Sequence, residues 1–274
     1  MWISKKDIIK LSADIRRIID GQETDLRDNR EGAWGILKND IHTLANLKNE
    51  QFDVLQHERD SMKDTLTNIS HQIKTPLTSM MIMTDLLEGA PPDKQVDFIS
   101  NIRSGLFRLE WLSSALLKMA KLDAGTVEFS GEPVSSYALA SLALEPLQVL
   151  LDIKNQSIEF TGEAELFCDK RWTSEALSNV IKNASEHSPD GSTIEIGFGQ
   201  NPISNWISVT DSGKGIAGNK IAGLFRRFEG SGSDKGYGIG LPLALAIMRG
   251  QNGDIEVDGG GNGIGATFTL KFFR

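Results

Sequence analysis

The sequence predicts an α+β protein in which a long helical hairpin precedes a mixed α/β sandwich. Between Ile41 and Met83 there is no glycine and only one proline, and apolar residues recur at helical spacing. A second stretch with the same spacing follows the turn residues Gly89–Asp93. Beyond Asp123 the pattern changes to short β-rich pieces that alternate with helices, so the hairpin and the sandwich are expected to be separate domains.

Length, composition and charge bound the kind of protein. The 274 residues suffice for about two domains, and 39% apolar with 24% charged residues is typical of a globular chain. The net charge of −8 argues against direct nucleic-acid binding, which needs a basic surface. Cys168 is the one cysteine; it cannot form an internal disulfide and is interpreted as a small buried apolar residue.

No segment of the chain is expected to enter a membrane. There is no apolar run of about eighteen residues, and residues 1–6 lack the apolar core of a signal peptide. The same polar, charged start is expected of a protein whose membrane segments lie upstream of residues 4–40.

The first long helix has one apolar stripe and needs partners to bury it. Pro92 suits the start of a second helix, which is predicted to run to about Leu122. Two such hairpins can bury all their stripes as a symmetric four-helix bundle, so the sequence predicts a homodimer. Asp123–Gly125 should break the second helix, which places the hairpin domain at 61–124 and the second domain at 125–274.

The second domain is predicted to alternate strands with helices. Its predicted helices span Tyr137–Leu151, Trp172–His187 and Leu241–Arg249. Its predicted strands span Thr126–Phe129, Ser157–Phe160, Thr193–Gly199, Trp206–Thr210, Asp254–Val257 and Thr267–Phe272. These elements suit a mixed α/β sandwich, with the glycines between Ser212 and Gly240 in a loop.

One histidine in the first long helix has an unusual setting. Pro76 follows His71 by five residues, and a proline inside a helix costs about 3 kcal/mol and kinks it, so its position is expected to serve a purpose. An exposed, unprotonated imidazole can accept a phosphoryl group through a ring nitrogen. A lone surface histidine on a helix seldom has a function, so the interpretation of His71 depends on the rest of the chain.

Three motifs in the second domain suit a nucleotide. Asn179 and Asn183 lie four residues apart on one helix face, where an amide oxygen could ligate Mg²⁺. Asp211 follows a strand and could accept a hydrogen bond from an amine such as that of adenine, although Asp-Ser-Gly is also a common turn. The glycines of Gly236–Gly240 lead into a helix and would let backbone N–H groups approach phosphates.

The order of the motifs is more specific than any one of them. The paired asparagines, Asp-x-Gly-x-Gly at Asp211–Gly215, the Phe-rich Leu224–Phe228 and Gly-x-Gly-x-Gly-Leu at Gly236–Leu241 follow Ser-His-x-x-Lys-Thr-Pro-Leu at Ser70–Leu77. In this order they resemble the boxes of the sensor histidine kinases, over about residues 60–274. The resemblance implies a dimerisation and phosphotransfer hairpin and an ATP-binding sandwich of the histidine kinase/gyrase/chaperone type.

The resemblance also implies an activity. The protein would use ATP and Mg²⁺ to phosphorylate His71 and would pass the phosphoryl group to an aspartate of a cognate response regulator. It would work at the cytoplasmic face of the cell membrane, attached only through an upstream segment, with residues 1–60 as connector and signalling helix. A surface hairpin with no signalling role is the alternative for residues 25–38.

By the same resemblance each motif residue takes a role. Asn183 would ligate Mg²⁺, Asn179 would contact the phosphates or the metal, and Asp211 would read the adenine. Arg227 would approach the phosphates. The pocket wall and the lid would come from glycines and one leucine: Gly213, Gly215, Gly236, Gly238, Gly240 and Leu241.

Three places depart from the family pattern. Gln72 stands where an acidic residue usually takes the imidazole proton, and a glutamine cannot act as a base near pH 7. Glu186 and His187 replace a basic and an aromatic residue; Glu186 is expected to point outward and His187 to take part of the phosphate-side role. The loop 229–235 is short and rich in Gly and Ser.

Several alternatives stay open at this point. Thr75 lies one turn after His71, where the family orients water against the partner's phospho-aspartate, but Thr75 could instead only cap the kink. An ATP hydrolase of the same superfamily is a rival interpretation, although such enzymes carry a glutamate in place of Asn179. A degenerate kinase that acts as a scaffold or a phosphatase is the other rival, suggested by Gln72 and Glu186.

Overall fold

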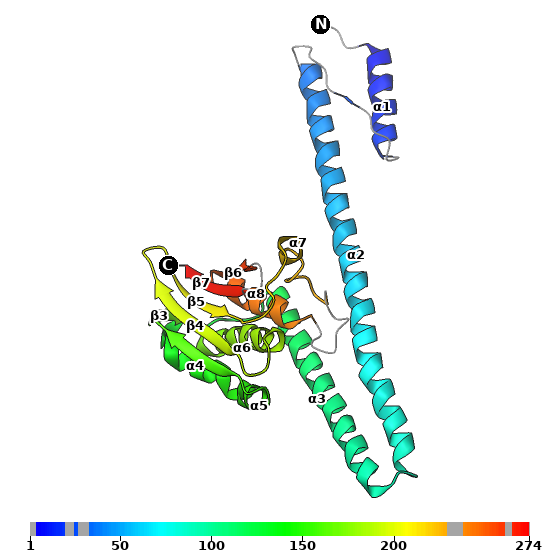
Figure 1. Ribbon diagram of the computed structural model, residues 1–274. Coiled ribbons are helices and arrows are strands. Elements are labelled where there is room, and N and C mark those ends of the chain that lie inside the picture. Colours follow the sequence, from blue (N-terminus) through cyan, green and yellow to red (C-terminus); the bar gives the residue numbers. More distant parts are fainter. Residues whose placement is uncertain (1–3, 20–24, 27–32, 229–237, 261–264, 274) are drawn as a thin grey trace. The chain divides into compact units, whose positions relative to one another are not determined.

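Two units make up the chain. The computed structural model describes residues 4–19, 25–26, 33–228, 238–260 and 265–273 (Figure 1). The units comprise residues 1–67 and 68–274, and each is described by itself. The helix α2 (Ala33–Leu87) begins in the first unit and ends in the second, so the predicted boundary between residues 60 and 61 falls inside a continuous helix.

The first unit contains a helix that the sequence pattern did not predict. α1 (Lys5–Ile19) begins after Ser4, whose hydroxyl accepts a hydrogen bond from Asp7 N (3.2 Å), while the Asp7 carboxylate accepts one from Ser4 N (3.1 Å). This reciprocal cap satisfies two backbone donors at the helix start. Leu11 of α1 and Leu26 are buried. α2 begins at Ala33, inside the stretch predicted to be a connector.

The predicted helical hairpin is confirmed. α2 passes through Pro76 without ending. Immediately before the proline, Thr75 Oγ1 donates a hydrogen bond to His71 O at 3.1 Å, so the threonine side chain supplements the backbone bonding there. α3 (Pro92–Asp123) starts with a proline in its first turn, where the missing N–H would have no partner within the helix.

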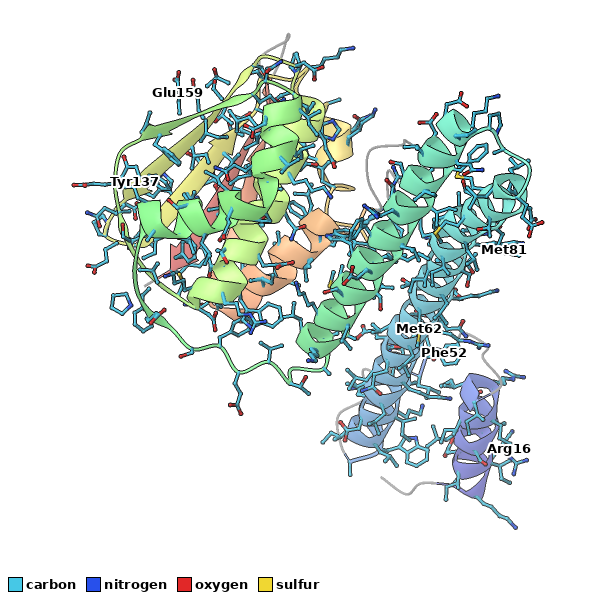
Figure 2. The ribbon with its side chains drawn as sticks, turned by 90° about the horizontal axis from the view of Figure 1, so that it is seen from below. Arg16, Phe52, Met62, Met81, Tyr137 and Glu159 are labelled. Atoms are coloured by element: carbon cyan, nitrogen blue, oxygen red, sulfur yellow. The ribbon has the colours of Figure 1, made fainter. Side chains whose placement is uncertain are left out.

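The two hairpin helices approach closely at one glycine. A Cβ on Gly105 of α3 would lie 2.7 Å from side-chain atoms of Met80 on α2, and Met80 is buried there. Other large apolar side chains of the hairpin stay exposed in the single chain, among them Ile73, Leu77 and Met81 (Figure 2). The hairpin therefore retains apolar surface that it does not bury itself.

A five-stranded sheet forms the second domain, in the order β2-β4-β5-β7-β6. β2 and β4 pair in parallel and the other neighbours are antiparallel. The strands are β2 (Ser157–Thr161), β4 (Thr193–Gln200), β5 (Ser204–Thr210), β7 (Thr267–Phe273) and β6 (Gly253–Asp258). Register pairs Ile196 with Val209 and Val209 with Phe268, so these buried side chains share one face of the sheet.

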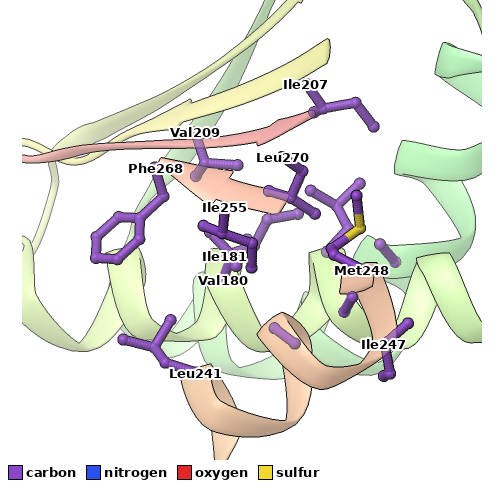
Figure 3. Packing of buried hydrophobic residues seen from close by; sticks show 14 of the residues in the cluster. Val180, Ile181, Ile207, Val209, Leu241, Ile247, Met248, Ile255, Phe268 and Leu270 are labelled. Atoms are coloured by element: carbon purple, nitrogen blue, oxygen red, sulfur yellow. The ribbon is translucent and has the colours of Figure 1, made fainter. Parts of the chain in front are cut away.

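Helices cover that face. They include α4 (Ser136–Leu144), α6 (Lys170–His187) and α8 (Gly240–Gly250), which lie on the same side of the sheet in Figure 1. Figure 3 shows Ile181 of α6 and Met248 of α8 packed beneath Leu270 of β7. Each such side chain stabilises the fold by about 1.5–3 kcal/mol through burial. This core fixes α6, α8 and the strand ends relative to one another.

One predicted strand is wrong and two strands were missed. Thr126–Phe129 forms no strand; the Phe129 ring packs edge-on against Trp172 instead, with centroids 5.9 Å apart. The strand in this region is β1 (Glu132–Ser135), which pairs antiparallel with β3 (Glu165–Cys168) in a separate two-stranded sheet. Cys168 is buried as predicted, and burial is the largest of the causes that raise the pKa of its thiol.

The predicted helix Tyr137–Leu151 is divided in three. α4 ends at Leu144, Glu145–Leu147 forms a 3₁₀ turn around Pro146, and α5 (Gln148–Ile153) follows. Proline has no N–H to continue the α-helical bonding, which explains the break.

One stretch of the second domain has the length and mean hydropathy of a membrane span, although Glu145 and Asp152 interrupt its apolar residues. Ser136–Ile153 is long and apolar enough to cross a membrane by length and composition. Five of its side chains are nevertheless buried in the core of the second domain, which identifies the stretch as a core element: Leu139, Ala140, Ala143, Leu147 and Leu151.

Candidate functional site

α6 carries the paired asparagines. Its N-cap is Asp169, whose carboxylate accepts hydrogen bonds from Arg171 N and Trp172 N at 3.0 Å each. Asn179 is buried, and its Nδ2 donates to Glu175 O at 2.9 Å. The amide oxygen of Asn179 is therefore left for other partners.

The start of α8 packs against that amide oxygen. A Cβ on Gly240 would lie 3.0 Å from Asn179 Oδ1, closer than nine in ten real contacts. Asn183 lies one turn further along α6 and is half-buried. The glycine thus lets the first turn of α8, with its free backbone N–H groups, approach the amide-bearing face of α6.

Asp211 stands at the end of β5 in a tightly held turn. Its backbone N donates to Ala266 O at 2.9 Å, and its Oδ1 accepts from Gly213 N at 2.7 Å. The carboxylate is buried, and Gly213 fits beside it because a Cβ there would lie 2.7 Å from His187 O. The turn predicted from the sequence is present, and it holds the carboxylate in one orientation.

Gly265 is a residue of this site that sequence reasoning missed. A Cβ at Gly265 would lie 1.7 Å from Asp211 O and 2.4 Å from Asp211 C, which is impossible without moving the backbone. Its place at the end of a glycine-rich stretch, two residues before the start of β7, was a usable signal. Gly215, which was predicted, has φ +74°, and the next residue, Ile216, donates from N to Gly259 O.

The predicted lid lies partly outside the described residues, and Gly236 is among those left out. Gly238 has φ +64°, and its carbonyl accepts a hydrogen bond from Phe228 N at 2.8 Å. Phe228 and Leu241 are buried in the core, and Phe225 packs against it. The Phe-rich segment and the start of α8 are therefore joined by a backbone bond and by packing.

Arg227 has a partner on the hairpin. Its Nη2 lies 2.7 Å from Asp123 Oδ1, at the end of α3, and both side chains are about half exposed. A role of Arg227 toward phosphate therefore requires it to leave this carboxylate.

Glu186 and His187 end α6 on its solvent side. Glu186 is half-buried and lies 3.9 Å from Lys182 Nζ, which in turn lies 4.9 Å from the centre of the Trp111 ring. The His187 side chain is exposed. Its carbonyl oxygen would lie 2.7 Å from a Cβ on Gly213, so the backbones of His187 and Gly213 are close neighbours. The structure thus connects His187 to the Asp211 turn through its backbone.

His71, Gln72 and Thr75 lie on α2, and His71 and Thr75 are exposed. Within the described part of the chain, no hydrogen bond or ion pair joins them to the residues around Asp211 and Asn179. The described residues also contain no group of three or more His, Cys, Asp or Glu side chains that could hold a metal. An amide oxygen together with the phosphates of a nucleotide is a ligand set that Mg²⁺ accepts.

Comparison with known proteins matches both parts of the chain. Residues 61–125 match the family described as His Kinase A (phospho-acceptor) domain, and residues 168–274 match the family described as histidine kinase-, DNA gyrase B-, and HSP90-like ATPase. His71 lies in the first range, and the residues from Asn179 to Leu241 lie in the second.

Curated relatives match across both ranges. The heme sensor protein HssS of Staphylococcus saprophyticus is 29% identical over 239 residues, or 82% of this chain, and the sensor histidine kinase WalK of Bacillus subtilis is 28% identical over 81%. The chain spans 52% and 39% of these relatives. A solved complex of the histidine kinase ThkA with the response regulator TrrA has the same fold, with a TM-score of 0.65 and 18% identity, over 83% of this chain and 66% of that one.

Proposed function

The chain belongs to the sensor histidine kinases of two-component systems, and from this we propose that it uses ATP to phosphorylate His71 and transfers the phosphoryl group to an aspartate of a response regulator. The proposal depends above all on one observation: a chain with His71 in a phospho-acceptor domain also has a buried carboxylate, Asp211, enclosed by Gly213 and Gly265. With γ-labelled ATP and Mg²⁺, the purified chain is expected to take up label that acid removes and base does not.

The residues of the site divide the work of phosphoryl transfer, which needs positioning and charge neutralisation more than covalent help. Bound Mg²⁺ would neutralise phosphate charge, with the Asn183 amide oxygen as a ligand and Asn179 beside it. The N–H groups at the start of α8, around Gly240, would face the phosphates. The unprotonated imidazole nitrogen of His71 would attack the γ-phosphorus as the bond from that phosphorus to the bridging oxygen breaks. ADP would leave, and the proton on the other ring nitrogen would pass to solvent. Gln72 would orient the imidazole by a hydrogen bond without taking its proton.

The Asn183→Ala substitution tests the metal assignment. We expect the affinity for ATP in the presence of Mg²⁺ to fall at least about tenfold, which is the effect of removing a group that supports a metal site. The affinity for ADP without metal should stay near that of the parent. Isothermal titration with and without Mg²⁺ measures both. An equal fall in the two conditions would mean that Asn183 serves the fold or the nucleotide, not the metal.

We also propose that the protein dephosphorylates its response regulator, with the Thr75 hydroxyl orienting water. Thr75→Ala should slow loss of phosphate from a phosphorylated regulator at least about tenfold, because a misplaced nucleophile is costly, and should leave labelling of His71 unchanged. Thr67→Ala is a matched control, since Thr67 Oγ1 donates to Lys63 O as Thr75 Oγ1 does to His71 O. Equal rates of phosphate loss with the Thr75→Ala and Thr67→Ala variants would mean that the Thr75 hydroxyl serves only the hydrogen bonding of its own helix.

The exposed apolar side chains of the hairpin support a homodimer. On α2 they include Ile73 and Leu77, and on α3 Ile99 and Leu106, all at helical spacing. Packing against a second hairpin in a four-helix bundle would bury them. Phe52 and Met62, which lie in the part of α2 that belongs to the first unit, are exposed as well (Figure 2), so the pairing would include that part of the helix.

Membership of the family supports a proposal for the partner and for the cellular location. ThkA was solved with a response regulator, and we propose a cognate regulator as the partner of this chain. We propose that the chain works at the cytoplasmic face of the membrane, connected through its first unit to an upstream sensor.

A scaffold without kinase activity, suggested by Gln72 and Glu186, is the second candidate for the function. It predicts nucleotide binding without any label on the protein.

A further inference from the structure

The turn between α5 and β2 reaches the C-terminal end of α6. Lys154 is the residue after α5, and Asn155 has φ +49°, a left-handed conformation that asparagine tolerates better than most residues. Backbone bonds join this turn to the segment after α6, from Gly191 N to Lys154 O at 2.8 Å and from Ser157 N to Ser192 O at 3.1 Å. The side chains on both sides of Asn155 therefore lie at the end of α6.

Lys154 and Gln156 bind the last carbonyls of α6 together. Lys154 Nζ donates to Ser185 O and, at 3.1 Å, to Ser188 O. Gln156 Nε2 donates to Ser185 O at 3.2 Å and to Pro189 O at 3.1 Å, and its Oε1 accepts from Ser185 Oγ at 2.6 Å. The C-terminal end of a helix leaves carbonyls without partners and carries partial negative charge. The Lys154 ammonium and the Gln156 amide both donate hydrogen bonds to these carbonyls, and the ammonium also offsets the charge.

Ser188 transmits this arrangement to the Asp211 turn. Its side chain is buried, and its Oγ accepts a hydrogen bond from Ser212 N at 3.1 Å. Ser212 Oγ donates in turn to Thr193 O at 2.6 Å, and Gly213 N donates to Asp211 Oδ1. The carboxylate thus depends on a chain of bonds that begins at Lys154 and Gln156.

We propose that Lys154, Gln156 and Ser188 are positioning residues that fix the Asp211 carboxylate relative to the asparagines of α6, and so determine the preference of the site for adenine. The proposal rests on the proposed function, because it takes Asp211 to bind a nucleotide base. The proposal assigns the three residues no contact with phosphate or metal. They hold the end of the helix that carries the metal side of the site and the turn that carries the base side.

The experiment compares ADP with GDP. In the full chain, Ser188→Ala and Gln156→Ala should lower the affinity for ADP by about tenfold, the size expected for one lost hydrogen bond, and should lower the affinity for GDP less. The ratio of the two dissociation constants should therefore move toward one. Lys154→Met should act in the same direction, and Lys154→Arg should restore the parent's ratio.

Gln251→Ala is the matched control for a purely structural effect. Gln251 caps the opposite end of α6, where its Oε1 accepts from Asp169 N at 2.7 Å and its Nε2 donates to Thr173 Oγ1 at 3.2 Å. Its loss should lower the melting temperature and leave the ADP to GDP ratio unchanged. A change of the ratio as large as that of Gln156→Ala would overturn the proposal, because any loosening of α6 would then suffice.

Asp211→Asn separates the two proposals. If this variant loses ADP affinity while the Ser188, Gln156 and Lys154 variants keep the parent's ratio, the positioning role is wrong and the nucleotide site stands. If Asp211→Asn binds ADP as the parent does, the assignment of Asp211 to the base and the positioning role both fall, while labelling of His71 still tests the kinase activity by itself. The outcome that supports both is a loss in Asp211→Asn together with a reduced ratio in the variants of the positioning residues.

Discussion

With γ-labelled ATP and Mg²⁺, the His71→Ala variant should take up no acid-labile label, while the parent chain is labelled. In the proposed transfer from ATP, the imidazole forms the bond to phosphorus, and alanine supplies no nucleophile in its place. Because His71 is exposed on the surface of α2, its loss should leave the fold and the affinity for ADP unchanged. Labelling followed by acid and base treatment measures the first expectation, and titration with ADP measures the second.

His42→Ala is the matched control on the same helix. His42 also lies in α2, many turns before His71, and its Nε2 is 3.3 Å from Asn46 Nδ2. Its loss should leave labelling unchanged. Label that survives in His71→Ala would mean that another residue accepts the phosphoryl group. If the parent binds ADP but takes up no label, the protein is a scaffold and not a kinase, because Gln72 then fails to support the transfer.

The hairpin and the strands of the five-stranded sheet could be predicted from the sequence, and the two four-residue strands of the smaller sheet could not. The hairpin and the core strands have repeated apolar positions that define one buried face. β1 and β3 have four residues each, and β1 contains Pro133, so neither gives a clear alternating pattern. Thr126–Phe129 has strand-like residues, but Phe129 is satisfied by packing on Trp172 without any ladder.

The same distinction applies to the site. Asn179, Asp211 and the glycines before α8 are local motifs, so their residue types could be predicted, whereas their roles in binding remain predictions. Lys154 and Gln156 act on carbonyls more than 25 residues away, and no local pattern indicates that. Gly265 is needed because the Asp211 backbone at the end of β5 lies against it. Only the pairing of β5 with β7 brings these two residues together.

Gly265→Ala should abolish measurable ADP binding or weaken it by at least about 100-fold, since an ångström of misplacement in a binding site can cost that much. The new Cβ would lie 1.7 Å from Asp211 O, so the strand end or the turn has to move by more than an ångström. Gly265 does not have a left-handed φ, so the effect is steric and not a backbone preference for glycine. Titration with ADP measures it, beside a thermal melt that establishes whether the variant is folded.

Gly218→Ala is the control for this change, because a Cβ at Gly218 meets nothing within 4 Å and its φ is also outside the left-handed region. It should bind ADP as the parent does. If Gly265→Ala does not fold, Asp211→Asn tests the same carboxylate without added bulk, since its amide oxygen can still accept the Gly213 N–H. A folded Gly265→Ala variant with the parent's affinity would show that the Asp211 turn can shift without consequence, and the base would then have to be bound elsewhere.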